Sequence, residues 1–300
     1  MADNTAGGDS ISVERRAPDE MFGLLGNDIR VRILDVLGRS PEAGLSFSEL
    51  FDRIELDDSG NFNYHLDKLC GSFIRKADGY ELTYAGKQVV GAIHAGTYTA
   101  NVTIDPVQIG WPCLLCGGEM VAEYRDGTAL IRCAACGKGA DFAFPPGSLD
   151  QFTRAELPHV FSRWWHHSVK RITDGFCPTC AGRLDGALVR PPGGDPDDPQ
   201  PSMTEFTCRR CGGQQYISGA TLATSHPIVE GFLAEHGFDT ANHHPSQVWQ
   251  ELASSAVRTL SEAPLRIEVR FTYNDEIVTA EIGPNATVSD VHRDTVPDDA

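Results

Sequence analysis

The clearest chemical signal in the chain is its cysteine spacing, because eight of its nine cysteines form four C-x-x-C pairs. The eight residues are Cys113, Cys116, Cys133, Cys136, Cys177, Cys180, Cys208 and Cys211. Four thiolates at this kind of spacing are the donor set of a structural zinc ion, and such a site leaves no coordination position open for catalysis. A chain without a secretory signal favours metal binding over disulfides. The sequence therefore predicts two closed Zn²⁺ sites.

The first two pairs are joined by a predicted β-hairpin, with strands over 120–125 and 129–132 around an Asp126-Gly127 turn. The hairpin would bring its own two C-x-x-C turns to one ion, so Cys113, Cys116, Cys133 and Cys136 form the first site. The other four cysteines form the second site, across a longer gap that contains the proline-rich stretch 191–201. Sequential pairing is preferred because crossed pairing must close longer loops. This layout is that of two zinc ribbons.

Composition sets the class of protein. The chain has 300 residues and a formal net charge of −17, which indicates about two domains with an acidic surface. No apolar run is long enough to span a membrane and the N-terminus lacks a signal-peptide pattern, so we expect a soluble, cytoplasmic protein. No metalloprotease, phosphate-loop or dinucleotide motif occurs, so we do not expect an enzyme. The excess of acidic residues opposes DNA binding. In a high-salt cytoplasm, screening would shorten the range of the repulsion between the protein and DNA phosphates.

The elements that would carry a function lie in the first third of the chain. Ser59 is the expected N-cap of a helix, and Phe62, Leu66, Leu69 and Phe73 recur at helical spacing as one apolar stripe. Asp78-Gly79 predicts a positive-φ turn between strands over 73–76 and 80–82. A polar-faced helix followed by such a wing is the layout of a winged helix-turn-helix, whose second helix enters the DNA major groove.

Local signals define the helices on either side. The Gly26-Asn27 pair predicts a break between two N-terminal helices, and Ser46 with Glu49 forms a capping box for a helix through Ile54. Thr83 is the expected cap of a further helix over 84–94. The predicted order is therefore helix, helix, helix-turn-helix, hairpin and helix.

Two stretches resemble a known family. FGLLGNDIRVRILDVL, from Phe22, resembles the opening of winged helices of the arsenical-resistance-repressor (ArsR) type, and FNYHLDKL, from Phe62, resembles the recognition helix of that family. The full arrangement also resembles regulators common in halophilic archaea. The resemblance implies a DNA-binding dimer. The apolar residues Val89, Val90 and Ile93 predict that this homodimer forms mainly through the first helix and the helix over 84–94; the alternative is that they pack on the first ribbon within one chain. The helix SFSELFDRI lacks the cysteine pair of metal-sensing members, so we do not expect their sensor site.

These observations predict a transcriptional regulator that binds a specific site on double-stranded DNA. The expected DNA-contacting residues are Ser59, Asn61, Asn63, Tyr64, His65 and Lys68 of the helix and Arg75 and Lys76 of the wing. The alternative is an adaptor similar to a transcription-initiation factor, in which the same modules dock on the transcription machinery without reading DNA sequence. No membrane partner is expected.

The expected fold class is α+β: a winged helix-turn-helix, two zinc-ribbon hairpins and a small C-terminal α+β segment. The predicted organisation is a disordered tail over 1–17, the DNA-binding domain over 18–98, the first ribbon over 99–145, a linking helix and second ribbon over 146–225, the C-terminal segment over 226–292 and a disordered tail over 293–300. The linking helix, over 156–173, should bury Trp164 and Trp165. Helices over 228–236 and 246–260 and strands over 265–273, 276–282 and 287–292 complete the prediction.

Overall fold

The computed structural model describes residues 13–40, 44–113, 116–190, 203–238 and 256–295. Contacts between residues divide the chain into two compact units. Unit 1 contains residues 1–100 together with 146–148, and unit 2 contains residues 101–145 and 149–300. The chain is mixed α+β, as expected, and all its sheets in the described residues are small and antiparallel.

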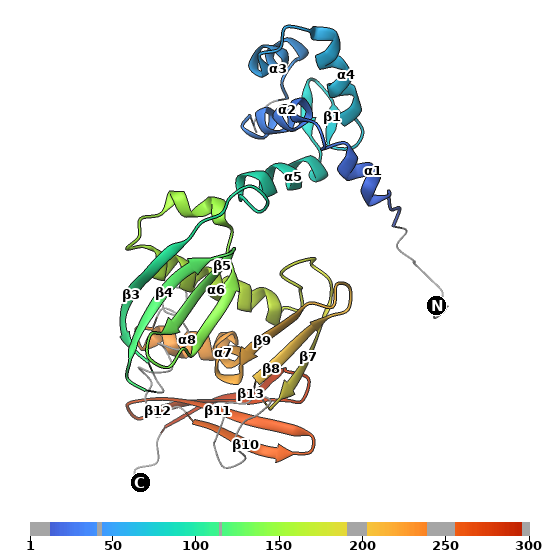
Figure 1. Cartoon of the computed structure of the whole chain (residues 1–300). Helices are drawn as coiled ribbons and strands as arrows, with labels where there is room; N and C mark the ends of the chain where they lie inside the picture. Colours follow the sequence, from blue (N-terminus) through green and yellow to red (C-terminus); the bar gives the residue numbers. More distant parts are fainter. Residues whose placement is uncertain (1–12, 41–43, 114–115, 191–202, 239–255, 296–300) are drawn as a thin grey trace, which may run out of the picture. The chain divides into compact units, whose positions relative to one another are not determined.

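Unit 1 consists, in its described residues, of five helices and one hairpin (Figure 1). They are α1 (Pro18–Gly23), α2 (Asp28–Gly38), α3 (Phe47–Ile54), α4 (Ser59–Leu69), β1 (Ile74–Lys76), β2 (Tyr80–Leu82) and α5 (Tyr84–His94). Side-chain caps set the starts of three helices, since Asn27, Ser46 and Thr83 each accept a hydrogen bond from an amide of the first turn. The break at Gly26-Asn27 and the capping box of Ser46 with Glu49 are therefore confirmed.

The apolar stripe of α4 lies at the centre of unit 1. Phe62, Leu66 and Leu69 are fully buried, as their helical spacing predicted. Their neighbours in the core come from α2, α3 and the hairpin and include Ile33, Leu34, Leu37, Leu50, Ile54, Phe73 and Ile74. Burial of this stripe leaves the opposite, polar face of α4 exposed.

Two details of unit 1 differ from the prediction. The N-cap of α4 is Asp58 rather than Ser59, because the Asp58 carboxylate accepts the amides of Gly60 and Asn61 at 2.8 and 3.1 Å. The Asp78-Gly79 turn does not use a positive φ. Gly79 is needed there for a different reason, since a Cβ would lie 2.7 Å from the Gly44 carbonyl carbon while Leu45 and Tyr80 exchange two backbone hydrogen bonds.

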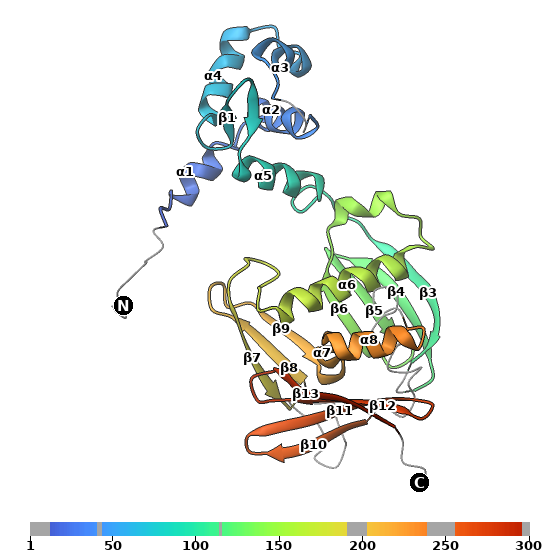
Figure 2. The same cartoon turned by 180° about the vertical axis from the view of Figure 1, so that it is seen from behind.

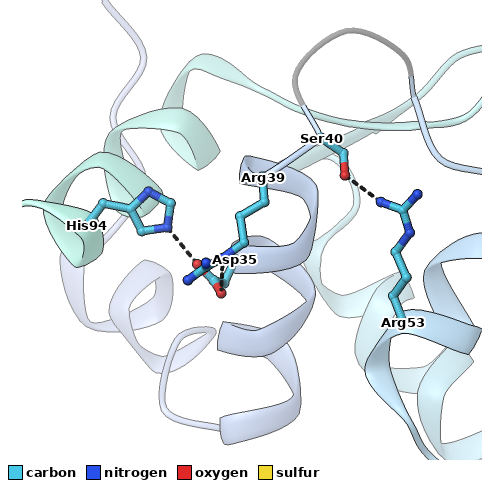
Figure 3. Close-up of polar contacts among 5 residues, drawn as sticks. All are labelled: Asp35, Arg39, Ser40, Arg53 and His94. Carbon is cyan, nitrogen blue, oxygen red and sulfur yellow. Dashed lines mark hydrogen bonds and ion pairs between the residues drawn. The ribbon is translucent and has the colours of Figure 1, made fainter.

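Polar contacts join the helices of unit 1 at their outer ends (Figure 3). His94 Nε2 lies 2.7 Å from Asp35 Oδ1, which links α5 to α2, and Arg39 Nε lies 2.9 Å from Asp35 Oδ2. Burial alone would raise the pKa of Asp35, but hydrogen bonds from His94 and Arg39 lower it below its ordinary value. Arg53 on α3 donates to Ser40 Oγ at 2.6 Å. Residues 13–17, which precede α1, have no regular secondary structure, and Arg16 donates to Ser72 Oγ at 2.6 Å.

Unit 2 contains three antiparallel sheets in its described residues (Figures 1 and 2). The first follows the order β3 (Ile104–Pro112), β4 (Glu119–Arg125), β5 (Thr128–Cys133), β6 (Gly139–Ala143). The second follows β7 (Leu184–Val189), β8 (Met203–Cys208), β9 (Gln214–Ser218), and the third follows β10 (Ala256–Glu262), β11 (Leu265–Tyr273), β12 (Glu276–Ile282), β13 (Val288–Thr295). Each sheet is a simple meander, so every strand pairs with its neighbour in sequence.

Three helices of unit 2 pack on these sheets: α6 (Leu157–Thr173), α7 (Gly219–Thr224) and α8 (Pro227–Glu235). The 3-10 helix η1 (Pro146–Gln151) precedes them, and its first three residues are assigned to unit 1. Phe161 of α6 contacts the rings of Tyr124, Phe142 and Phe144. The ring centres of Trp165 and Phe142 lie 5.2 Å apart. Figure 2 shows α6 across the first sheet, and α8 contacts β12 and β13. One continuous core therefore connects both cysteine-bearing sheets to the C-terminal sheet.

Several predictions for unit 2 need correction. Trp164 is 40% exposed, because Phe161 and Trp165 occupy the centre of the α6 face on the sheet. Trp164 lies at the margin of that face, where its indole donates to the Ala143 carbonyl at 2.8 Å and its ring contacts Phe144. The predicted helix over 246–260 is wrong from residue 256 onward, where β10 pairs with β11. Residues 239–255 lie outside the described residues. β13 continues through Arg293 to Thr295, so the predicted tail begins too early.

The helices also bear on membrane association. In the residues that the structure describes, no helix combines the length and the apolar character that a membrane crossing requires. The longest of these, α6, carries Arg163, Lys170 and Arg171.

A matched pair of glycines in α5 tests the packing of unit 1. A Cβ at Gly86 would lie 2.2 Å from the Phe73 carbonyl oxygen, whereas one at Gly91 would meet no atom within 4 Å. We expect Gly86→Ala to lower the free energy of unfolding of unit 1 by about 1–3 kcal/mol through overpacking. Gly91→Ala should raise it by up to about 1 kcal/mol, because alanine favours helix.

Amide hydrogen exchange over residues 18–98 of the full chain measures both changes. Equal protection in the two variants would show that α5 does not pack on Phe73 as described.

Candidate metal centres and candidate nucleic-acid interface

The eight paired cysteines gather into two groups of four in unit 2. Cys113, Cys116, Cys133 and Cys136 form the first four-cysteine cluster, and Cys177, Cys180, Cys208 and Cys211 form the second. Within each cluster all four Sγ atoms lie within 4.8 Å of one another. The sequential grouping predicted from loop lengths is therefore confirmed, and each cluster can hold one metal ion.

The same backbone turn occurs at all four C-x-x-C pairs. The amide of the first cysteine donates to the carbonyl five residues later at 2.7–2.9 Å, and the amide four residues later donates back at 2.9–3.0 Å. The residue four positions after the first cysteine has a positive φ in every pair, from 54° at Ala181 to 72° at Gly137. This turn places both thiols of a pair on one side, so two turns joined by a hairpin face each other across the metal position.

The sulfur positions fit a tetrahedral ion. A zinc ion bound to four thiolates at about 2.3 Å separates its sulfurs by about 3.8 Å. In the first cluster the Cys113–Cys136 and Cys116–Cys133 Sγ distances are 3.7 and 3.5 Å. In the second cluster the Cys177–Cys211 and Cys180–Cys208 distances are 3.8 and 3.5 Å. The two clusters are thus near copies of each other and have the dimensions of a four-coordinate site.

Backbone amides stabilise negative charge at sulfurs of both clusters. The amides of Cys136 and Ala135 lower the pKa of the Cys133 thiol to about 6, and those of Cys211 and Arg210 do the same for Cys208. The Gly118 amide lowers the pKa of Cys116, but the neighbouring Cys133 and Cys136 sulfurs raise it to about 12. A bound cation would favour the thiolate at every position, because its charge offsets the repulsion between sulfurs.

Two glycines that sequence reasoning did not single out are part of these sites. A Cβ at Gly118 would lie 3.0 Å from Cys133 Sγ, and one at Gly182 would lie 2.9 Å from Cys208 Sγ. Both occupy the same place, two residues after the second cysteine of the first pair. The C-x-x-C-x-G spacing was therefore the signal that could have found them.

The predicted DNA-contacting residues of α4 lie on one exposed surface of unit 1. Ser59, Asn61, Asn63, Tyr64 and Lys68 are exposed, and His65 is half-buried. Asn63 Nδ2 donates to Asp67 Oδ2 at 3.0 Å, one helical turn along. Lys68 Nζ lies 5.6 Å from the centre of the Tyr64 ring, a cation–π distance. The helix thus presents amide, phenol and ammonium groups side by side.

The hairpin carries the other two predicted residues. Arg75 and Glu81 are directly opposite in the β1–β2 register, and the guanidinium donates to the Glu81 carboxylate at 2.7 and 2.9 Å. Lys76 Nζ lies 5.4 Å from the Tyr80 ring centre. Sequence reasoning did not identify Asp67 and Glu81 as partners of these residues, although the i,i+4 and cross-strand spacings indicate them. Both partners are acids, so the surface of unit 1 is less basic than its arginine and lysines alone suggest.

The comparison with known families assigns the chain. It belongs to the family named domain of unknown function DUF7351, which matches residues 110–288 and so covers both four-cysteine clusters and most of unit 2. The domain of unknown function DUF7347 matches residues 18–93, which contain α1 to α4 and most of α5. No curated protein and no solved structure matches the chain. One family match therefore falls within unit 1, and the other covers most of unit 2.

Replacing one thiol tests the assignment of ligands. We expect Cys133→Ser to lower the metal content by one ion per chain and to leave the second cluster loaded, because three thiolates bind a metal far less tightly than four. Cys70→Ser is the matched control, since Cys70 is the one cysteine outside both clusters. Elemental analysis of reduced protein measures the ratio, and an unchanged metal content in Cys133→Ser would contradict the first site.

Proposed function

We propose that this protein is a DNA-binding transcriptional regulator of the winged helix-turn-helix class, similar to the arsenical-resistance-repressor type, with two structural zinc ribbons in unit 2. The observation that carries the proposal is the pairing of α4 with the β1–β2 hairpin: an apolar stripe buried in unit 1 and an exposed face of amides, a tyrosine and a lysine. In this interpretation α3 and α4 are the helix-turn-helix, and the hairpin is the wing.

The chemistry of the α4 face supports sequence reading. Asparagine amides donate to and accept from adenine in a bidentate geometry, which discriminates one base pair from another in the major groove. Asn61 and Asn63 lie in the first half of α4, the part of a recognition helix that contacts base edges. Asn63 is held by Asp67 before binding, so contact with DNA exchanges one hydrogen bond for another.

The acidic balance of the protein sets the conditions for binding. With Arg75 paired to Glu81, the phosphate contacts available to the hairpin come mainly from Lys76. Affinity from phosphate neutralisation is therefore small, and specific base contacts must supply more of it. High salt favours this mode, since a Debye length of about 3 Å at 1 M screens the repulsion between DNA and a chain of net charge −17.

Zinc is the metal that suits the two four-cysteine clusters best. Four thiolates in a tetrahedral arrangement select zinc or iron–sulfur chemistry, and one four-sulfur site per ion fits zinc. Small meanders of this kind bury little apolar surface by themselves, so metal binding contributes much of their folding free energy. The role we propose for both ions is structural, and the protein as a whole is not proposed to be an enzyme.

We also propose that the regulator acts as a homodimer through α1 and α5. Phe22 of α1 and Tyr84 of α5 are 71% and 79% exposed, so both rings are available to a dimer interface. Val90, predicted to contribute to this surface, is instead buried against Gly38. A dimer places two α4 helices on two half-sites, so a selected DNA site should have approximate two-fold symmetry.

Selection of binding sites from a random duplex library at high salt tests the proposal. The wild-type protein should enrich a paired half-site. The double variant Asn63→Ala/Tyr64→Ala should lose discrimination at about 1–3 kcal/mol per base contact. Arg75→Ala/Lys76→Ala should weaken binding to all sequences and reduce its salt dependence.

Gln151→Ala, at an exposed position of unit 2 outside the proposed DNA contacts and the proposed dimer helices, is the matched control and should select the wild-type site. Failure of the wild-type protein to enrich any sequence would overturn DNA reading. It would favour the alternative, an adaptor that docks on the transcription machinery.

A further inference from the structure

The outer side of α6, the helix that lies across the first sheet (Figure 2), carries basic side chains and no acid. Within its 17 residues there is neither aspartate nor glutamate, although the chain has a formal net charge of −17. Exposed residues recur at every fourth position: His159, Arg163, His167 and Arg171. Residues four apart lie on one side of a helix and about 6 Å apart along its axis. The helix therefore presents one row of basic side chains to solvent.

Backbone contacts connect the end of this row to the second four-cysteine cluster. The Phe176 amide donates to the Arg171 carbonyl at 3.1 Å, and Phe176 forms an antiparallel bridge with Arg183. The Arg209 amide donates to the Arg183 carbonyl at 3.0 Å, and Arg210 follows it in the same C-x-x-C turn. We refer to four exposed residues of this region as the arginine line: Arg163, Arg171, Arg183 and Arg210.

The arginine line differs from the other arginines of unit 2 in its lack of partners. Seven arginines of unit 2 lie within ion-pair distance of a carboxylate: Arg132, Arg190, Arg209, Arg258, Arg266, Arg270 and Arg293. Arg154 donates to two backbone carbonyls. In the residues that the structure describes, no hydrogen bond or ion pair engages a side chain of the arginine line, and only Arg125, at the β4–β5 turn, shares this state in unit 2. The unpaired arginines of unit 2 are thus concentrated in one region.

Asp174 and Asp185 are the acids nearest to the arginine line in sequence. Arg209 engages Asp185 at 2.6 Å, and this hydrogen bond, helped by the charges of Arg209 and Arg183, holds the pKa of Asp185 below its ordinary value. Asp174, at the C-cap of α6, is exposed. Because Arg209 already offsets Asp185, the four guanidinium groups outweigh the single remaining carboxylate, and the local balance is positive.

We propose that the arginine line binds the phosphate backbone of double-stranded DNA without reading its sequence. Guanidinium groups bind phosphate oxygens in a bidentate geometry, and a duplex presents one negative charge per about 1.7 Å of its axis. This surface belongs to unit 2, so it does not depend on the proposed base contacts of α4. It would supply phosphate contacts that the hairpin lacks, since Arg75 is paired with Glu81.

The aromatic side chains beside the line favour a duplex over a single strand. Proteins that bind single strands without sequence preference stack successive bases on several aromatic rings. Trp164 is already engaged, because its indole donates to the Ala143 carbonyl and its ring lies 5.2 Å from that of Phe144. Phe176 is 54% exposed but is a single ring. The surface therefore offers positive charge rather than a series of stacking positions.

Fluorescence anisotropy with a random-sequence DNA duplex, over a series of KCl concentrations, tests the arginine line. The full chain carries Arg75→Ala/Lys76→Ala throughout, so that the hairpin contributes little. Adding Arg171→Gln should weaken binding severalfold and reduce the slope of log K against log salt by about 0.9, the value for one lost phosphate contact. Adding Arg163→Gln/Arg171→Gln/Arg183→Gln instead should reduce the slope by about 2.7.

Arg125→Gln is the matched control, because it removes an exposed, unpaired arginine of unit 2 outside the line and should change neither affinity nor slope. Metal content and hydrogen exchange over residues 110–288 check that every variant remains folded. Equal losses in Arg125→Gln and Arg171→Gln would show an effect of net charge alone and overturn the proposal. Tighter binding of a single strand of the same sequence would also overturn it, as would equal competition by poly-L-glutamate, which would indicate an acidic polypeptide as the partner.

The outcome is separable from that of the proposed function. If the wild-type protein enriches no sequence but the arginine variants show these losses, sequence reading by α4 fails and the arginine line stands. If the wild-type protein enriches a site while the triple arginine variant binds the random duplex as before, the arginine line fails and the proposed function stands.

Discussion

The convergence of four cysteine sulfurs at each of two points is the constraint on which the rest of unit 2 depends. The four turns share one hydrogen-bond pattern, so their backbone amides hold each pair of thiols in a fixed direction. A metal ion bound at either cluster would join two turns that are distant in sequence but close at the end of a hairpin. β4 and β5, and likewise β7 and β8, connect one turn with the other, and their antiparallel register brings the two turns of each cluster together. The core formed by α6, α7 and the C-terminal sheet then packs on surfaces that the clusters define.

Unit 1 depends instead on an apolar core made by its own helices and hairpin, and its charged groups occupy the surface. Asp35, Asp67 and Glu81 each contact a side chain that could otherwise bind an anion: His94, Asn63 and Arg75. These contacts offer an internal substitute for the phosphate or carboxylate that a ligand brings. Local pairing of this kind reconciles an acidic protein with a proposed DNA-binding face. On binding, each of these side chains would exchange its hydrogen bond to an acidic neighbour for one to DNA, rather than lose bound water.

Local signals allowed much of this architecture to be predicted from sequence, and non-local packing decided where the predictions failed. The four-cysteine clusters and the strands over 265–273 and 276–282 follow from spacing and alternation within a few residues. Asp126-Gly127 adopts the positive-φ turn that its residues favour, whereas Asp78-Gly79 does not, because the chain near Gly44 packs against it. The strand β10 depends on pairing with β11, and the exposure of Trp164 depends on which side of α6 contacts the sheet. The residues of β10 do not by themselves reveal β11 as a partner, and those of α6 do not reveal which side of the helix faces the sheet.

The central claim is that two metal ions in the four-cysteine clusters organise unit 2, while unit 1 folds on its apolar core. The most direct measurement is amide hydrogen exchange of the full chain before and after removal of metal with a strong chelator under reducing conditions, with the bound metal counted by native mass spectrometry. The account predicts two zinc ions per chain, and loss of protection over residues 110–288 on chelation with retention over 18–93. A metal-free chain whose residues 110–288 stay fully protected would contradict it.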